Sequence, residues 1–389
     1  MIKGKKIQFS QLVILAGGRG SRLKELTSNK PKPLVKIKNN KTFLDALIEN
    51  FSRYPINEIL ILCGYKYKRI YEKFHNKKIN NITIKCTTEQ RPLGTAGALK
   101  NSSSLLKDYF FLCNGDTYFD INIFDLALAY KTNKVGVIAC SKKNKGSRYL
   151  SVKNKYVNGG VYFFNKKNLL KRIKTKVSSL ENDIFPKLLK EKKIIMKKYY
   201  SDFLDIGIKK DYKKANNYIL LKKKKKTVLL DRDGVINYDY GHVGSLNRFK
   251  FKPNVAKAIK LLNDNNFYVF VVSNQSGVGR NYYTKKSVNR INKYISKVLK
   301  RYGAHIDSFY SAFYFADSKN REYRKGKEFR KPGIGMFKLI SNKWSIDKRK
   351  TFMVGDQDSD QQFASNLNIK YFNIKKSQNL LSVTKKIIS

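Results

Sequence analysis

Three things are scarce in this chain of 389 residues: cysteine, acidic side chains and long apolar runs. No run of about 18 apolar residues occurs, which argues against a membrane-spanning helix. The apolar stretch near the N-terminus is also too short for the core of a signal peptide. We therefore expect a cytoplasmic protein with no membrane partner. The four cysteines stand singly, without a C-x-x-C pair, and this favours buried free thiols in a reducing compartment.

Basic residues far outnumber acidic ones: Lys and Arg total 82, Asp and Glu total 28, and the formal net charge is +54. Such a charge predicts affinity for polyanions, which include nucleic acids, anionic membranes and small phosphorylated substrates. The excess is nearly all lysine and is spread along the chain. We therefore favour a solvated lysine surface and expect no specific nucleic-acid partner. The sequence does not indicate an oligomeric state.

Apolar, β-branched runs alternate with amphipathic segments along the chain. Residues 42–51, for example, carry apolar side chains at helical spacing behind a threonine, a preferred N-cap residue. This alternation predicts an α/β fold in which helices cover both faces of a mostly parallel sheet, with ligands beyond the carboxyl ends of the strands. The strands expected in the first half are residues 12–16, 59–63, 82–86, 109–113 and 135–140.

Five consecutive lysines, Lys222 to Lys226, interrupt the alternation. Because they repel one another and cannot pack against a core, we expect a linker there. The sequence thus predicts two doubly wound, three-layer α/β domains, at residues 1–221 and 227–389. In the second domain we expect strands at 227–230, 268–273 and 351–354 and helices near 255–262 and 287–299.

The first glycine-rich string of the chain reads LVILAGGRGSRLKELTSNKPKPLVKI. Gly17, Gly18 and Gly20 allow the backbone to approach a phosphate closely and to point N–H groups at it. Arg22 and Lys32 can supply the countercharge as catalytic cations. The string resembles the signature of sugar-1-phosphate nucleotidyltransferases, in which this loop holds the triphosphate of a nucleotide. The resemblance implies a Rossmann-like domain with a mixed sheet.

The resemblance continues along the first domain. EQRPLGTAGAL looks like the segment that reads base and sugar, which implies that Glu89 and Gly94 bind the nucleotide. The Glu89 carboxylate could accept hydrogen bonds from N1–H and the amino group of guanine, which predicts GTP. The alternative is that Glu89 only ends a strand at the surface. NGGVYFF and SLENDIFP resemble the sugar-binding segments and implicate Asn158, Gly159 and Glu181.

Two further strings, NGDTYFD and FLDIGIKKDY, resemble the metal-binding loops of the same family and imply that Asp116 and Asp205 hold Mg²⁺. Attack by a sugar phosphate on an α-phosphate brings two anions together, so the site needs Mg²⁺ and cations more than a covalent nucleophile. One departure concerns a phosphate-binding lysine that many relatives carry in a Glu-Lys-Pro segment. Here that stretch is short, and Lys153 and Lys155 are both candidates.

The second half opens with TVLLDRDGVINYD, in which an apolar strand delivers Asp231 and Asp233 into a turn. This string closely resembles the haloacid dehalogenase-type phosphatases. There the first aspartate attacks phosphorus, and the second protonates the leaving alcohol and later activates water. The resemblance also implies a Mg²⁺ site formed by both aspartates and by Asp356 of VGDQDSD, with Asp360 nearby to orient it.

The remaining motifs of this superfamily follow in order. VVSNQSGVGR implies that Ser273 and Asn274 bind the transferring phosphoryl group. FRKPGIGM brings Arg330, expected to bind phosphate, and Lys331, which would offset the charge of phosphate and aspartate. Relatives often hold a structural zinc through Cys and His in the loop before this motif. The second domain contains no cysteine, so we expect no zinc.

The chain has three histidines. His75 and His305 lack metal-ligand spacing, and we expect surface or satisfied structural residues. His242 follows the DxD loop closely enough that it could contact substrate.

Together the motifs imply two consecutive reactions. The phosphatase motifs look like those of heptose-1,7-bisphosphate and histidinol phosphatases, and the first domain most closely resembles the D-glycero-α-D-manno-heptose 1-phosphate guanylyltransferases. The phosphatase would supply the heptose 1-phosphate that is converted with GTP to GDP-heptose and pyrophosphate, for a surface polysaccharide. Two alternatives stay open. One is the same chemistry on other substrates, such as mannose 1-phosphate and histidinol phosphate, and the other is a basic nucleic-acid-binding protein on degenerate enzyme scaffolds.

Overall fold

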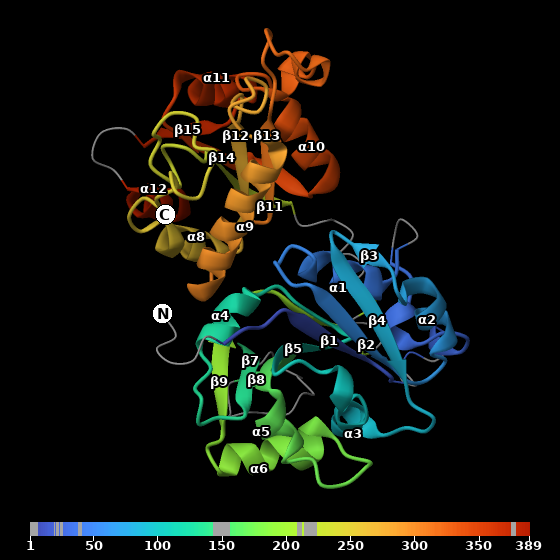
Figure 1. Ribbon diagram of the computed structural model, residues 1–389. Helices are drawn as coiled ribbons and strands as arrows, with labels where there is room; N and C mark the ends of the chain where they lie inside the picture. The colour runs from blue at the N-terminus through green and yellow to red at the C-terminus, as the bar shows by residue number, and fades with distance from the viewer. Residues whose placement is uncertain are drawn as a thin grey trace. The chain divides into compact units, whose positions relative to one another are not determined.

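The computed structural model describes residues 7–18, 20, 23, 26–37, 41–142, 156–207, 212–213, 224–374 and 379–389. The chain divides into two compact units, residues 2–221 and residues 222–389. In each unit helices lie on both faces of a central sheet (Figure 1). This confirms the two three-layer α/β folds expected from the alternation of strands and helices.

The strands of the first unit include all five that the sequence predicted. They are β1 (Gln11–Ala16), β2 (Glu58–Cys63), β3 (Lys78–Ile79), β4 (Ile82–Thr88), β5 (Tyr109–Asn114), β6 (Thr117–Phe119), β7 (Gly136–Lys142), β8 (Tyr156–Asn165), β9 (Ile194–Tyr199) and β10 (Phe203–Asp205). Eight of them form one sheet in the order β3-β4-β2-β1-β5-β8-β7-β9, and β6 pairs with β10. The sheet is mixed because β8 runs antiparallel to both β5 and β7.

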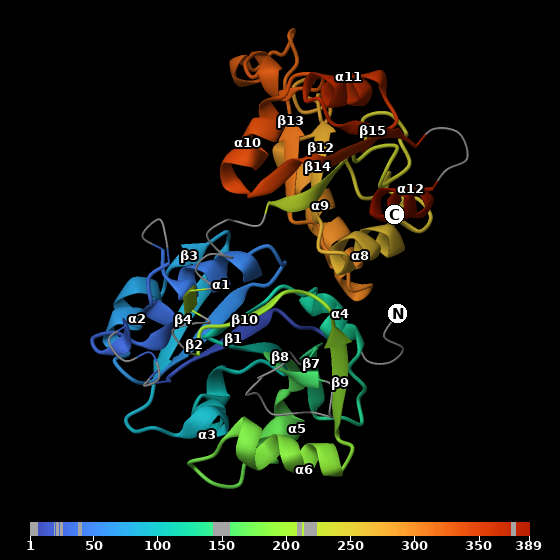
Figure 2. The same cartoon turned by 180° about the vertical axis from the view of Figure 1, so that it is seen from behind.

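Successive side chains of β1 point to opposite faces of the sheet, and both sets are apolar because helices cover both faces. Leu12 and Ile14 pack in the core that includes α1, α2 and α4, whereas Val13 packs in the core of α3, α5 and α6. Figure 2 shows these two groups of helices on opposite faces of the sheet. The Thr42 hydroxyl accepts from the backbone of Asp45 and caps α1, as expected. The helical segments are α1 (Phe43–Phe51), α2 (Lys68–Phe74), α3 (Gly94–Asn101), α4 (Ile123–Leu128), α5 (Lys166–Leu170), α6 (Phe185–Lys190), η2 (Lys32–Leu34), η3 (Ser103–Leu105) and η4 (Leu180–Ile184).

A five-stranded, all-parallel sheet forms the centre of the second unit. Its strands are β11 (Lys225–Leu230), β12 (Tyr268–Asn274), β13 (Ser308–Ala312), β14 (Ile346–Gly355) and β15 (Lys370–Asn373), in the order β13-β12-β11-β14-β15. The helical segments are α8 (Val255–Asp264), α9 (Lys285–Arg301), α10 (Gly335–Lys343), α11 (Asp358–Asn366), α12 (Leu380–Ile388), η5 (Arg321–Arg324) and η6 (Lys327–Phe329). Helices α8, α9 and α12 pack on one face, and α10 and α11 on the other. None of the helices in the described ranges has the length and apolar character needed to cross a membrane.

The last two lysines of the run, Lys225 and Lys226, belong to a strand and not to a linker. β11 begins at Lys225, whose side chain is buried. Its Nζ donates to Oδ1 of Asn266 at 2.8 Å and lies over the ring of Tyr268. The prediction of a linker through Lys226 is therefore wrong for the last two lysines, because a lysine stem can pack while its ammonium group reaches a polar partner.

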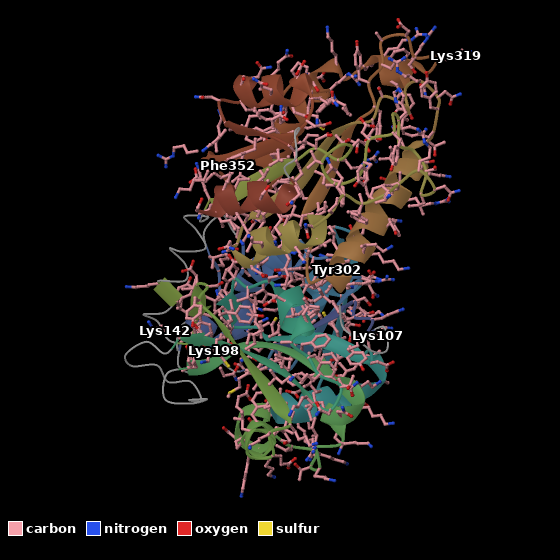
Figure 3. The ribbon with its side chains drawn as sticks, turned by 90° about the vertical axis from the view of Figure 1, so that its left-hand side faces the viewer. Lys107, Lys142, Lys198, Tyr302, Lys319 and Phe352 are labelled. Carbon is pink, nitrogen blue, oxygen red and sulfur yellow. The ribbon has the colours of Figure 1, made fainter. Side chains whose placement is uncertain are left out.

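Lysines project from many separate elements. Figure 3 labels Lys107, Lys142 and Lys198 in the first unit and Lys319 in the second, and all four are exposed. They lie on different strands and loops rather than on one face of one element. The solvated lysine surface stays a prediction.

Candidate active sites

A cavity of about 520 Å³ opens at the carboxyl ends of β1, β2 and β5 in the first unit. This is the edge at which a doubly wound sheet binds its ligands, and the volume is typical of small-molecule sites. Six predicted residues line it: Gly17, Gly18, Lys32, Glu89, Gly94 and Asp116. The structure therefore brings most of the predicted nucleotide site to one place.

The glycines after β1 meet different needs. A Cβ at Gly20, where φ is +68°, would lie 2.9 Å from Cβ of Lys32, and one at Gly17 would lie 3.3 Å from Oε1 of Glu89. A Cβ at Gly18 would meet no atom within 4 Å. Packing thus explains Gly17 and Gly20, whereas the open space at Gly18 is what a phosphate-binding loop requires. Arg22, the other cation predicted for this loop, lies outside the described residues, as do Lys153 and Lys155.

Lys32 joins the two aspartates expected to hold a metal. Its Nζ lies 2.5 Å from Oδ2 of Asp116 and 3.8 Å from Oδ1 of Asp205. The pairing of β6 with β10 sets this geometry, since Asp205 lies opposite Thr117, the neighbour of Asp116. Two carboxylates that face one ammonium group can also share a divalent ion, so these oxygen donors fit Mg²⁺.

The Glu89 carboxylate lies where three loops meet. Its Oε2 accepts from the backbone N–H of Leu93 at 3.3 Å, and an added Cβ at Gly64 would lie 2.5 Å from its Oε1. Partial burial raises the pKa of Glu89, and the Leu93 hydrogen bond offsets part of that rise. Glu89 therefore packs the loops together as well as lining the cavity, a role that the sequence did not suggest.

Packing also accounts for the other two predicted glycines. Gly94, with φ of +74°, begins α3, and a Cβ there would lie 2.5 Å from the carbonyl oxygen of Ser178. A Cβ at Gly159 would lie 2.4 Å from the ring of Phe119. Both positions require glycine even without a ligand, so their identity alone does not mark a binding contact.

The predicted sugar-binding residues surround one buried phenol. Asn158 donates to Oη of Tyr162 at 2.8 Å. Burial, together with the charge of Glu181, raises the pKa of Tyr162 well above its usual value. Oε2 of Glu181 accepts from the hydroxyl of Thr95 at 2.8 Å. Asn114 lines the cavity, and its buried Oδ1 has no hydrogen-bond partner within the described part of the chain. That acceptor suits a sugar hydroxyl.

In the second unit, Asp231 follows the central strand β11 and is buried. The Nζ of Lys331 lies 2.6 Å from Oδ1 of Asp231 and 2.6 Å from Oδ1 of Asp360. Burial raises the pKa of Asp231 to about 7, against the opposing effect of Lys331. Burial lowers the pKa of Lys331, but the two carboxylates outweigh it and the net shift is upward. The geometry therefore suits Lys331 to offset the charge of Asp231, the predicted nucleophile.

Three carboxylates converge beside this ion pair. Oxygens of Asp231, Asp356 and Asp360 lie within 4.8 Å of one another, and no other such group occurs in the described ranges. The sequence had predicted Asp233 in this set and Asp360 beside it. The Asp233 carboxylate instead accepts hydrogen bonds from three side chains, those of Arg232, Asn237 and Gln275. Asp360 thus lies in the carboxylate cluster, whereas the turn at Asp233 directs its side chain to these donors. Metal binding by Asp233 stays a prediction.

The side chain of Asn274, predicted to bind the phosphoryl group, contacts the backbone of Lys331. Its Nδ2 donates to the carbonyl oxygen of Lys331 at 3.0 Å, and its Oδ1 accepts from the Lys331 N–H at 2.9 Å. These two bonds position Lys331. Phosphoryl binding by Ser273, Asn274 and Arg330 stays a prediction. Burial, with the nearby Arg280, lowers the pKa of Arg330. Nη1 of Arg330 is buried without a hydrogen-bond partner among the residues described, as suits an anion site.

Comparison with known proteins identifies both units. Residues 11–149 match the nucleotidyl transferase family, and residues 236–376 match the polynucleotide kinase 3 phosphatase family. Over 143 residues the chain is 36% identical to D-glycero-beta-D-manno-heptose-1,7-bisphosphate 7-phosphatase of Rhodopseudomonas palustris, which is 37% of this chain and 79% of that protein. Over 223 residues it is 33% identical to D-glycero-alpha-D-manno-heptose 1-phosphate guanylyltransferase of Campylobacter jejuni, covering 52% of this chain and 96% of that protein. The chain belongs to both families. The resemblance drawn from the motifs is thus confirmed.

A third relative bears on substrate choice. The nucleotidyl transferase domain is also similar to mannose-1-phosphate guanylyltransferase catalytic subunit beta of Dictyostelium discoideum, at 32% identity over 251 residues. That match covers 58% of this chain and 69% of the relative.

The phosphatase domain's loop before Arg330 is held by charge and aromatic contacts. Lys285 pairs with Glu322 at 2.6 Å and lies over the ring of Tyr323. Nε of Arg324 donates to the carbonyl oxygen of Ser318 at 2.6 Å. These contacts hold the loop, and the absence of zinc stays a prediction.

The histidines take different places. His75 stacks on Tyr71 and accepts from a backbone N–H. His305 is buried, and its Nε2 lies 3.6 Å from Oδ1 of Asp307. His242 is exposed and lies edge-on to the ring of Tyr282 at 5.0 Å. Its contact with substrate stays a prediction. All four cysteines are buried and free, which confirms that expectation: Cys63, Cys86, Cys113 and Cys140.

Four residues near the sites were missed from the sequence. Arg232 lies between the two DxD aspartates, Gln275 follows Asn274, and Asn114 precedes Asp116 by two positions. Tyr283 donates to Gln275 from the loop after β12. For the first three, adjacency to a motif residue at a strand end was the available signal. No sequence signal marked Tyr283 as part of the site.

Proposed function

We propose that the chain is a bifunctional enzyme of GDP-heptose synthesis. The phosphatase domain removes the 7-phosphate of D-glycero-α-D-manno-heptose 1,7-bisphosphate, and the nucleotidyl transferase domain then transfers GMP from GTP to heptose 1-phosphate, releasing pyrophosphate. One observation carries the proposal: a single chain joins two sites whose relatives act on consecutive substrates, a heptose bisphosphate and a heptose 1-phosphate. The product would serve a surface polysaccharide.

In the phosphatase domain, Asp231 is the nucleophile. Its carboxylate attacks phosphorus, the bond from phosphorus to the sugar oxygen breaks, and Asp233 gives that oxygen its proton. Asp233 then takes a proton from the water that hydrolyses the aspartyl phosphate. Lys331 neutralises the nucleophile and Ser273 donates to a phosphoryl oxygen. The oxygens of Asp231 and Asp356 would hold Mg²⁺, which when bound offsets the charge of the phosphoryl group.

In the nucleotidyl transferase domain, catalysis rests on positioning and charge. The loop at Gly18 holds the triphosphate, and Lys32 neutralises the transferred phosphoryl group. Asp116 and Asp205 would hold Mg²⁺, which draws the two reacting phosphates together when bound. Asn158, Glu181 and Asn114 place the sugar so that its phosphate oxygen attacks the α-phosphate in line. Lys32 then leaves the two aspartates for the phosphates.

The anomer follows from the fusion. The phosphatase relative is named for the β-bisphosphate, whereas the guanylyltransferase relative is named for the α-1-phosphate. Removal of the 7-phosphate does not change the anomeric carbon. A chain that performs both steps must therefore take the α-bisphosphate.

The test is a substrate panel with Mg²⁺. The bisphosphate arm contains the α- and β-heptose 1,7-bisphosphates and histidinol phosphate, and the nucleotidyl arm contains heptose 1-phosphate and mannose 1-phosphate with GTP, ATP and UTP. We expect the α-bisphosphate to be the preferred phosphatase substrate and heptose 1-phosphate with GTP to be the preferred pair. Mannose 1-phosphate is included because the Dictyostelium relative is named for it. Preference for mannose 1-phosphate would overturn the heptose assignment.

A further inference from the structure

Gln275 is the centre of a buried hydrogen-bond network in the phosphatase domain. The residue follows β12 and is 1% exposed. Its Nε2 donates to Oδ2 of Asp233 at 2.7 Å and to Oγ of Ser273 at 2.8 Å. Its Oε1 accepts from Nη2 of Arg232 at 3.0 Å and from Oη of Tyr283 at 3.0 Å. The amide of Gln275 therefore donates both of its N–H groups and accepts two hydrogen bonds at its oxygen.

The chemistry of the partners fixes the orientation of this amide. Arg232 is only a donor, so the atom facing it must be the carbonyl oxygen. The atom on the other side of the amide, which faces Oδ2 of Asp233, is therefore the NH₂ group. A flipped amide would place two donors together at Arg232. Gln275 can thus adopt one orientation.

Tyr283 is itself locked in place. Its ring lies in a slot between two glycines: a Cβ added at Gly244 would lie 2.1 Å from a ring atom, and one added at Gly277 would lie 2.3 Å from another. Among the residues that the structure describes, the one side chain to which its hydroxyl hydrogen-bonds is that of Gln275. The two glycines therefore serve to bring this phenol to the amide.

The network has a consequence at each end. Because Ser273 accepts from Gln275, its own O–H is directed to another acceptor, as a phosphoryl-binding hydroxyl requires. Asp233 is held at Oδ2 by Gln275 and Arg232 and at Oδ1 by Arg232 and Asn237. One amide thus sets the orientation of the group that binds the phosphoryl oxygen and of the group that transfers the proton.

We propose that Gln275 is a positioning residue that couples phosphoryl binding by Ser273 to proton transfer by Asp233. The hydrogen bond from Tyr283 fixes the position of Gln275. The inference rests on the proposed phosphatase function. In the first step the bond from Asp231 to phosphorus forms, the bond from phosphorus to the ester oxygen breaks, and the proton of Asp233 goes to that oxygen. Misplacement of Asp233 matters most when the leaving oxygen is strongly basic, because such an oxygen cannot depart unprotonated.

The experiment compares two leaving groups in the full-length protein. Gln275→Met keeps the size of the side chain and removes its four hydrogen bonds. Heptose 1,7-bisphosphate has a strongly basic alkoxide leaving group, whereas p-nitrophenyl phosphate leaves without protonation. We expect the first-turnover rate with the bisphosphate to fall about 10²-fold, with a smaller change in KM. The first-turnover release of p-nitrophenolate should stay near that of the unaltered protein. Gln361→Met, at an exposed position on α11, is the matched control.

Tyr283→Phe gives the graded version of the same test. It removes only the hydroxyl that holds Gln275, so we expect a smaller loss with the same dependence on leaving group. If Gln275→Met does not fold, this variant decides the question. Equal losses with both substrates would mean that the network only supports the fold, and unchanged rates with both would mean that it does nothing for proton transfer. Either result overturns the inference. Failure of the proposed function shows separately, as absence of bisphosphate hydrolysis in the unaltered protein.

Discussion

The Nζ of Lys331 lies 2.6 Å from Oδ1 of Asp231, and the two side chains are only 2% and 9% exposed. A second carboxylate, that of Asp360, lies at the same distance from the ammonium group. One cation therefore compensates two anions in a place with little water. Removing one member of such a buried set leaves uncompensated charge behind.

Lys331→Met should therefore destabilise the phosphatase domain as well as inactivate it. We expect the free energy of unfolding at neutral pH to fall by about 3–5 kcal/mol. Calorimetry of the full chain measures the loss, and Lys338→Met at an exposed position on α10 is the control. An unchanged unfolding transition would contradict the argument that Lys331 compensates both carboxylates.

Asp116→Ala and Asp205→Ala should each remove most nucleotidyl transfer and leave phosphatase activity intact. Each change strips a Mg²⁺ ligand and a partner of Lys32, whereas the phosphatase site is built on a separate core. Both activities are measured on the same preparation, with Asp108→Ala at an exposed position as the control. Elemental analysis of that preparation should show no stoichiometric zinc, and finding zinc would contradict the ligand count.

Glu89→Gln tests how the base is read. If the carboxylate accepts from N1–H and the amino group of guanine, the variant should lose about tenfold of its preference for GTP over ATP, since a charged hydrogen bond is replaced by a poorer one. Steady-state competition between GTP and ATP measures the ratio. Glu72→Gln, exposed on α2, is the control. An unchanged ratio of GTP to ATP turnover would mean that Glu89 packs the loops together and does not read the base.

The strands, the helices and the position of the motif residues at strand ends could be predicted because they depend on local pattern. The strand that ends at Leu230 and the aspartates that follow it are visible as an apolar run with a motif at its end. The pairing of Lys331 with Asp231 also follows from superfamily motifs 100 residues apart.

What could not be predicted depends on side-chain direction and on partners distant in sequence. Asn274 and Asp360 stand in motifs, but nothing in a string of letters shows that Asn274 binds the Lys331 backbone or that Asp360 points to the same ammonium group. The same holds for Lys225, whose burial depends on Asn266 and on Tyr268. Tertiary contacts decided all three.

Lys300 gives a prediction on pH. Burial lowers its pKa from 10.5 to about 8, so between these values the folded state binds fewer protons than the unfolded state. Burial of the charged Lys300 therefore destabilises the folded state fully below about pH 8, and this penalty shrinks as the pH rises toward 10.5. Lys300→Met should be more stable than the unaltered protein at pH 7, and the difference should shrink toward pH 10. Calorimetry at several pH values checks this, with the exposed Lys297→Met as the control. A difference that is constant with pH would contradict it.

Asp231→Asn separates a two-step enzyme from two unrelated activities in one chain. The change keeps the size of the side chain but removes the anionic oxygen that attacks phosphorus, and loss of such a nucleophile commonly costs a factor on the order of 10⁶. With heptose 1,7-bisphosphate and GTP as substrates, the variant should leave the bisphosphate unconverted and make no GDP-heptose. With added heptose 1-phosphate it should make GDP-heptose at the normal rate, because the nucleotidyl transferase cavity is lined by residues of the first unit only. Product analysis by chromatography reads both arms. If the variant still converts bisphosphate to GDP-heptose at the original rate, then either Asp231 is not the nucleophile or dephosphorylation is not on the route.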